Sequence, residues 1–186
     1  MQIGNYLRIM GFKYTVHSDK LYFLTHTVVD WIDVFTRQEL AMIVVDSLNY
    51  CISNKGLEVF AWCLMPSHLH MIARTAEADG NLSNIMRDFK KFTSKKIVKT
   101  IPEINESRKE WLIRHLQTGV NSFQVWKEGM HPIELYSQKF MDQKLDYIHN
   151  NPVAAGIVYE PQQYVFSSAR DYYESIKCMV NICYLG

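Results

Sequence analysis

Two apolar runs, residues 59–65 and 68–73, meet at the dipeptide Pro66-Ser67, and this stretch constrains the fold more than any other. Short apolar runs joined by a proline-containing turn predict two strands of a β-hairpin. Side chains alternate between the two faces of a strand, so His68 and His70 are expected on one face. Two neutral imidazoles on one strand supply half of a metal site. The alternative is that one ring satisfies a backbone carbonyl while the other is exposed.

The segments around this hairpin predict an alternating order of strands and helices. Residues 20–29 are rich in aromatic and β-branched side chains, which indicates a buried strand. Residues 36–54 begin with Thr36 and Glu39 in a capping pattern and continue as an amphipathic helix. The other expected elements are strands at 57–64 and 68–75, a helix at 81–100 with Phe92 in its apolar stripe, a short helix within 102–117, a strand at 122–126, and a helix at 137–150 that Pro152 ends, before loops over 153–170.

The order strand, helix, strand, strand, helix, strand is that of the ferredoxin-like split βαβ arrangement. The sequence therefore predicts an α+β fold with a central antiparallel sheet, helices on one face, and an extra C-terminal helix that bears a tyrosine. The first and third strands would lie in the middle of the sheet, which places the two histidines at its centre. The length of 186 residues fits a single domain, with a core at about 12–173 and a tail at 174–186.

Composition indicates a globular chain, with 48% hydrophobic and 21% charged residues. The four cysteines show no zinc-binding spacing, which favours a protein with reduced thiols. Residues 1–14 lack the features of a signal peptide, and no apolar run approaches the length of a membrane span. We therefore expect a cytoplasmic protein with no membrane segment.

The helix at 81–100 concentrates positive charge, although the net charge of the whole chain is only +1. Such a run is often a solvated helix face, but an excess of one sign also suits a phosphate backbone. The residues predicted to contact DNA are Arg87, Lys90, Lys91, Lys95 and Lys96.

A tyrosine and an amide lie one turn apart near the end of the expected helix at 137–150. Residues four apart share a helical face, so Tyr147 and Asn151 could be directed at one point and join His68 and His70 there. The alternative is that Tyr147 is a half-buried packing residue and that Asn151 caps the next turn. His149 lies far around the helix from Tyr147 and is not expected at the metal.

Histidines outside these motifs are expected to be structural or exposed. They are His17, His26, His115 and His131, of which His26 lies on the first, central strand.

Two motifs at this separation resemble those of a known family. Residues 64–71 (LMPSHLHM) and 144–158 (KLDYIHNNPVAAGIV) are similar to the single-tyrosine HUH transposases. Within them the resemblance is to the REP-associated tyrosine transposases (RAYTs), in which MPNHVHL and YIHxNPVxAGLV recur. Residues 164–172 (YVFSSARDY) resemble the W-S-S-Y tail of that group, with Phe166 in place of tryptophan. The resemblance covers roughly residues 12–173.

The resemblance implies a site and an activity. His68 and His70 would be metal ligands, Asn151 the third ligand and Tyr147 the nucleophile, although a residue before proline is biased away from helix. The cofactor would be Mg²⁺ or Mn²⁺, and the substrate would be single-stranded DNA beside a hairpin. Cleavage would give a 5′-phosphotyrosine and a free 3′-OH, in DNA transposition or in the processing of REP-type hairpins. Minimal relatives are homodimers, whereas the RAYT-like tail favours a monomer.

Two other functions remain open on the sequence. One is a domesticated, non-catalytic module that binds DNA or RNA through the same sheet and basic helix. The other is a metal-dependent hydrolase in which water replaces Tyr147 as the nucleophile. The intact set of His68, His70, Tyr147 and Asn151 argues against the first, and Tyr147→Phe separates the second from the transposase.

Overall fold

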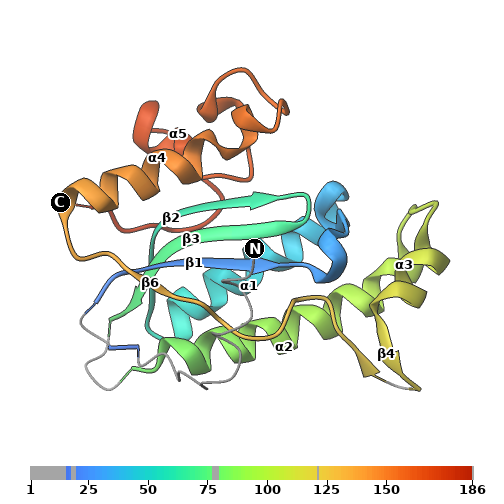
Figure 1. The fold of residues 1–186 in the computed structure, drawn as a ribbon. Helices are drawn as coiled ribbons and strands as arrows, with labels where there is room; N and C mark the ends of the chain where they lie inside the picture. The colour runs from blue at the N-terminus through green and yellow to red at the C-terminus, as the bar shows by residue number, and fades with distance from the viewer. Residues whose placement is uncertain (1–15, 18–19, 77–79, 121, 186) are drawn as a thin grey trace, which may run out of the picture.

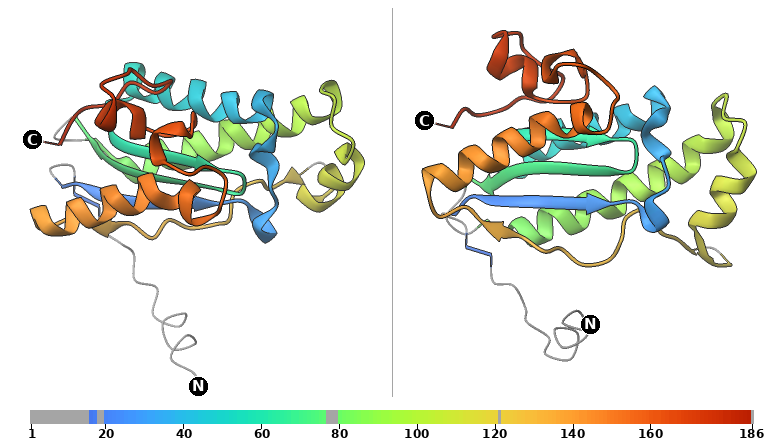
Figure 2. Two further views of the ribbon diagram at one scale, coloured as in Figure 1. Left: turned by 90° about the horizontal axis from the view of Figure 1, so that it is seen from above. Right: turned by 45° about the horizontal axis from the view of Figure 1, so that its top comes forward.

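The computed structural model describes residues 16–17, 20–76, 80–120 and 122–185. The prediction about a signal peptide concerns residues 1–14, which lie outside this described part. The start of the expected core, at about residue 12, also lies outside it. The described chain forms three layers, with a β-sheet between α1 (Gln38–Asn54) and α2 (Leu82–Thr100) on one face and α4 (Gln138–Ala154) on the other (Figures 1 and 2). The predicted α+β class is confirmed.

The central sheet has the strand order β2-β3-β1-β6, and every neighbouring pair is antiparallel. Its strands are β1 (Tyr22–Thr27), β2 (Leu57–Met65), β3 (His68–Thr75) and β6 (Ile133–Glu134). The first and third strands therefore lie in the middle, as the split βαβ order predicts.

The prediction of the fourth strand at 122–126 is wrong. Within that stretch, β5 (Ser122–Phe123) pairs with β4 (Gln117–Gly119) in a separate two-stranded sheet. Val125 and Trp126 are buried, and Trp126 makes only an isolated antiparallel bridge with Val28 beyond the end of β1. The fourth position of the central sheet falls to β6, which pairs with β1 through two residue pairs.

The start of α1 also differs from the prediction. The hydroxyl of Thr36 donates to the carbonyl of Asp33 at 3.0 Å, within a short 3-10 turn, and is not available as a helix cap. Arg37 is the N-cap, without a side-chain capping bond, and the helix begins at Gln38.

Thr93 replaces Phe92 in the buried stripe of α2. Thr93 donates to the carbonyl of Phe89 at 2.8 Å and accepts a hydrogen bond from the Trp126 indole at 2.8 Å. These bonds satisfy its hydroxyl in the core, whereas Phe92 is 61% exposed. Asn81 caps the helix by accepting from the backbone N–H of Asn84 at 2.9 Å.

Pro152 does not end α4, which continues to Ala154 with Pro152 in its last turn. Gly156 follows at φ 69°, a left-handed conformation that glycine adopts without strain. The N–H of Ile157 donates to the carbonyl of Pro152 at 2.9 Å and that of Gly156 to Val153 at 2.9 Å, which is a Schellman cap.

The C-terminal segment covers the outer edge of β2. The N–H of Leu64 donates to the Phe166 carbonyl at 2.8 Å, and the N–H of Ser168 donates to the Trp62 carbonyl at 2.9 Å. These bonds occupy edge groups that would otherwise be open to another strand. The remaining elements are α3 (Lys109–Leu116), α5 (Ala169–Tyr173) and the 3-10 helices Val29–Trp31, Val34–Thr36, Ile101–Glu103 and Pro161–Gln163.

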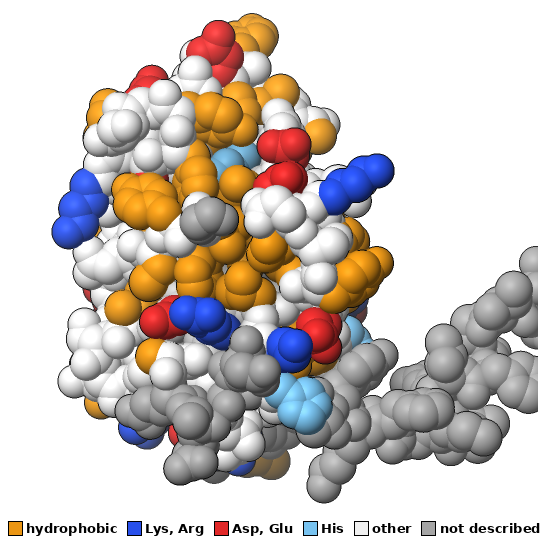
Figure 3. Space-filling view, turned by 90° about the vertical axis from the view of Figure 1, so that its left-hand side faces the viewer, with side chains coloured by type: hydrophobic (Ala, Val, Ile, Leu, Met, Phe, Trp, Pro, Cys, Tyr) orange, Lys and Arg blue, Asp and Glu red, His pale blue; other side chains and the backbone are white. Residues whose placement is uncertain are grey.

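Figure 3 shows hydrophobic side chains gathered on the left-hand end of the molecule, with charged side chains mainly around them. Among the described helices, none combines the length and the apolar character needed to cross a membrane.

Candidate functional site

His68 and His70 lie side by side on the face of β3 that α4 partly covers. The strand alternation places them with Ile72, which packs in the apolar cluster beneath α4, while Leu69 and Met71 face α1 and α2. The centroids of the two imidazole rings are 4.7 Å apart, with the rings inclined at 73°. Two ring nitrogens can thus be directed at one point, as the sequence predicts.

A hydroxyl group holds each ring through its Nδ1 atom. The register of the sheet places Thr25 directly opposite His70, and the Thr25 Oγ1 atom lies 2.8 Å from His70 Nδ1. Ser67 Oγ lies 3.2 Å from His68 Nδ1. Since Nδ1 of each ring is engaged by a hydroxyl, a metal would bind through Nε2, which is how metal-binding histidines are usually oriented.

Both imidazoles are neutral at pH 7. Burial is the main cause that lowers the pKa of His70 to about 3, with smaller electrostatic contributions from His68, Lys144 and His26. Burial also lowers the pKa of His68, against an opposing effect from its hydrogen bond with the Asn151 side chain. A neutral ring keeps the lone pair that coordination requires.

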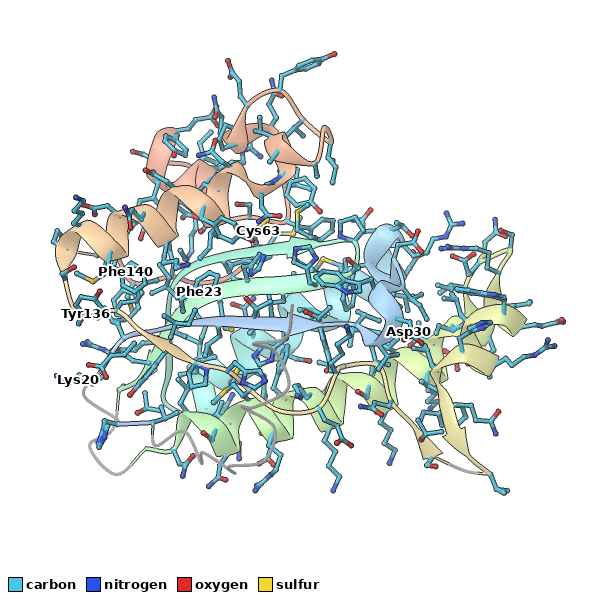
Figure 4. The ribbon with its side chains drawn as sticks, in the orientation of Figure 1. Lys20, Phe23, Asp30, Cys63, Tyr136 and Phe140 are labelled. Atoms are coloured by element: carbon cyan, nitrogen blue, oxygen red, sulfur yellow. The ribbon has the colours of Figure 1, made fainter. Side chains whose placement is uncertain are left out.

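Tyr147 lies above the histidines on α4. Its ring centroid is 5.2 Å from that of His70 and 5.9 Å from that of Phe23, and its side chain is 48% exposed. Figure 4 shows Phe23 on the sheet beneath α4. Asn151 follows one turn later, still within the helix, so the expected bias away from helix before Pro152 does not displace it. The structure thus brings all four predicted residues together.

Lys144 is a member of this cluster that the sequence analysis missed. Its amine lies 4.7 Å from the ring centroid of Phe23 and 5.6 Å from that of Tyr147. The sequence spacing could have revealed it, because Lys144 lies three residues before Tyr147 and residues three apart share a helical face. The positive charge of Lys144 would stabilise negative charge on the phenol oxygen of Tyr147.

The donor set fits a divalent cation that keeps open positions. No group of three or more His, Cys, Asp or Glu side chains that could hold a metal occurs in the described part of the chain. Asn151, which hydrogen-bonds to His68, offers an amide oxygen as a third ligand beside the two imidazoles. Two imidazoles with an amide oxygen leave room for water and a phosphate oxygen, unlike a closed structural zinc site.

The predicted DNA-contacting residues lie on α2, on the face of the sheet opposite the histidines (Figure 2). Four of the five line a groove of about 930 Å³ between α2 and residues 118–129, which holds six Lys and Arg side chains and one carboxylate. The four are Arg87, Lys90, Lys91 and Lys95, whereas Lys96 lines a different pocket beside α1.

Lys90 has a structural role in this groove. Its amine donates to the carbonyls of Lys127 at 2.8 Å and Gly129 at 2.9 Å, and burial lowers its pKa. Arg87, Lys91 and Lys95 have exposed side chains.

The other histidines lie away from the cluster. His149 is buried and its Nε2 atom lies 2.9 Å from Ser168 Oγ. His26 is buried on the opposite face of the sheet, between the rings of Phe89 and Trp126. His17, His115 and His131 are exposed.

Comparison with known proteins identifies the class. Residues 32–151 match the family model described as "Transposase IS200 like". This match covers more than half of the chain, which therefore belongs to the IS200-like transposases, as its motifs predict.

Two individual proteins are similar to this chain. A protein of Haemophilus influenzae described as a REP-associated tyrosine transposase is 26% identical over 111 residues, or 60% of this chain. The match spans only 58% of that relative's length. A solved structure of a REP-associated tyrosine transposase bound to a REP hairpin superposes with a TM-score of 0.62 at 18% identity, covering 92% of this chain and 89% of the other. The two chains share a fold.

Proposed function

We propose that this protein is a divalent-metal-dependent endonuclease and strand transferase for single-stranded DNA, with Tyr147 as its nucleophile. The observation that carries the proposal is the Tyr147 ring 5.2 Å from His70, on a helix whose Asn151 bonds to His68. Membership of a transposase family supports the reaction class. The relative solved with a REP hairpin supports a hairpin-bearing substrate, in DNA transposition or in the processing of REP-type elements.

His68, His70 and Asn151 would hold Mg²⁺ or Mn²⁺. The bound cation would withdraw charge from the scissile phosphate and hold it in line for attack. The hydroxyls of Thr25 and Ser67 hold the two rings through Nδ1 and so fix the direction of their Nε2 atoms. Phe23 packs against both His70 and Tyr147, which keeps the nucleophile above this point.

Tyr147 performs the transfer. Its Oη atom forms a bond to phosphorus while the bond to the 3′ oxygen breaks, the phenol loses its proton, and the leaving oxygen gains one from solvent. The positive charge of Lys144 lies 5.6 Å from the ring centroid and stabilises the developing phenolate. Attack by a 3′-OH on the phosphotyrosine reverses these bonds and rejoins DNA without ATP, since the bond energy is kept in the covalent link.

The phosphate backbone of the substrate lies along the basic groove, where Arg87, Lys91 and Lys95 have exposed side chains. Each phosphate contact contributes about −0.7 to −0.9 to the slope of log affinity against log salt. Charge reversal at Lys91 and Lys95 should therefore weaken binding and flatten this slope. Unchanged binding would refute the assignment of the groove.

Packing of α4 on the sheet of its own chain, with Tyr147 beside His70, supports a site formed by a single chain. We therefore expect a monomer that cleaves with its own tyrosine. Sedimentation velocity should give a mass near 21.8 kDa, and a mass twice that value would indicate a homodimer.

The test of the function is covalent capture. The protein is incubated with Mn²⁺ and labelled single-stranded hairpin DNA from the flanks of its own gene, beside Tyr147→Phe, His68→Ala and the control Tyr159→Phe, whose ring is 93% exposed. A labelled protein band should form with the wild type and the control and be absent from the other two. DNA binding without an adduct would favour a non-catalytic module. Cleavage that survives Tyr147→Phe would mean that water is the nucleophile.

A further inference from the structure

We propose that Trp31 is a stacking platform for a nucleobase of the single strand next to the scissile phosphate. This inference rests on the proposed function and adds a residue that positions the substrate. Trp31 follows β1 at the end of the sheet where β3 begins with His68, and Figure 4 shows its neighbour Asp30 at that end.

The indole is open to solvent at the margin of the site. Trp31 is 58% exposed, and its ring centroid is 5.5 Å from that of His68. The Lys127 amine lies 5.2 Å from the indole centroid, so a positive charge accompanies the aromatic surface. An exposed aromatic ring with a nearby cation is the combination by which proteins hold single-stranded nucleic acid.

The backbone at this position indicates a purpose other than packing. Asp30 and Trp31 have φ values of 51° and 58°, so two successive side-chain-bearing residues occupy the left-handed region. That conformation is rare for a bulky residue, and glycine or asparagine would satisfy a simple turn with less strain. Burial does not explain the presence of tryptophan at this position, because Trp31 is 58% exposed.

Hydrogen bonds hold the strained turn in place. The N–H of Trp31 donates to the Val28 carbonyl at 3.1 Å, and the N–H of Val28 donates to Ser67, the residue before His68, at 2.8 Å. The N–H of Phe35 donates to the Pro66 carbonyl at 2.9 Å. The turn that carries Trp31 is thus tied to the hairpin turn that positions His68, so the indole keeps a fixed place relative to the histidines.

Lys127 connects this platform to the basic groove. It lines the groove together with Lys91 and Lys95, and its amine contacts the Trp31 ring. The N–H of Lys127 donates to the carbonyl of Thr27 at 2.8 Å, which fixes it at the end of β1. A strand that leaves the groove therefore reaches His68 by passing the indole, around the end of the sheet.

Fluorescence gives a readout that does not depend on cleavage. In a Trp111→Phe background Trp31 is the remaining exposed tryptophan, because Trp62 and Trp126 are buried. Titration with single-stranded dT12 should quench the emission, and the added change Trp31→Phe should abolish the quenching. Absence of quenching while dT12 binds would overturn the proposal.

Binding and adduct assays then test the role in the reaction. Trp31→Gly should weaken binding of a hairpin with a single-stranded extension by about 5- to 100-fold, while Trp31→Phe retains most of it. The melting temperature of Trp31→Gly should be unchanged or raised, since glycine adopts positive φ without strain. The control Tyr50→Ala, at the same 58% exposure on α1, should bind as the wild type does.

An abasic position in the extension identifies the stacked base. At one such position, the wild type should lose as much binding affinity as Trp31→Gly causes with intact DNA. The same abasic DNA should cause no further loss of affinity in Trp31→Gly. If the wild type forms the adduct and Trp31→Gly binds and reacts equally well, the stacking proposal is wrong while the function stands. If no adduct forms but dT12 still quenches Trp31, the function fails and the platform stands.

Discussion

Ser168→Ala should destabilise this protein more than removal of its other buried serine hydroxyls. Ser168 Oγ accepts a hydrogen bond from the backbone N–H of Trp62 at 3.0 Å and lies 2.9 Å from His149 Nε2. Ser168, Trp62 and His149 are all fully buried. One hydroxyl therefore satisfies a group on β2 and a group on α4, and it joins the helix to the sheet beside Tyr147 and Asn151.

The expected magnitude follows from the number of groups left without a partner. Alanine removes the hydroxyl and orphans two buried polar groups, each worth about 1–3 kcal/mol. The predicted loss is about 2–6 kcal/mol, a large part of a typical stability of about 5–15 kcal/mol.

Ser47→Ala is the matched control. Ser47 is 6% exposed, and its hydroxyl donates to the carbonyl of Ile43 in the same helix at 2.6 Å. That carbonyl keeps its place in the ladder of α1 after the change, so the predicted loss is at most about 1 kcal/mol.

Urea unfolding at pH 7, followed by circular dichroism, measures both variants. The adduct assay should also respond to Ser168→Ala, because the hydroxyl anchors, through His149, the part of α4 that bears Tyr147 and Asn151. A loss in Ser168→Ala no greater than that in Ser47→Ala would refute the reasoning that one hydroxyl serves two buried groups.

Three further outcomes are expected. Burial lowers the pKa of His26 to about 3, so the ring stays neutral in the folded protein but gains a proton below about pH 6.5 in the unfolded chain. The free energy of unfolding should therefore decrease as the pH is lowered from about 6.5 to about 5. In urea titrations over this range, His26→Leu should lose about 2 kcal/mol less stability than the wild type. Lys144→Met should slow adduct formation about 10- to 100-fold with hairpin binding little changed, because it removes a charge beside the phenol; equal rates would exclude that role. EDTA should abolish the adduct and Mn²⁺ should restore it, whereas an adduct formed in EDTA would contradict the assigned ligands.

Much of the fold and the core of the site followed from the sequence because short-range patterns determine them. The hairpin around Pro66-Ser67 fixed the face of His68 and His70, and β3 has the predicted bounds, His68–Thr75. Helical spacing placed Tyr147 and Asn151 together. The fourth strand could not be found this way, since β6 contains only Ile133 and Glu134 and exists through its pairing with β1. Trp31 was missed because nothing local marks a tryptophan as exposed and left-handed.

Pro152 is an exception to the rule that a helix ends before a proline, because α4 continues through it to Ala154. A proline has no N–H for the carbonyl four residues earlier, here that of Ile148, so a helix is expected to end before it. Ending α4 at Asn150 would remove Asn151 from the face of Tyr147 and break the contact with His68. The helix continues because Pro152 is buried and because Gly156 closes the next turn with a Schellman cap. The cap satisfies the carbonyls of Pro152 and Val153 in the last turn, and Asn151 stays in the helix on the face of Tyr147.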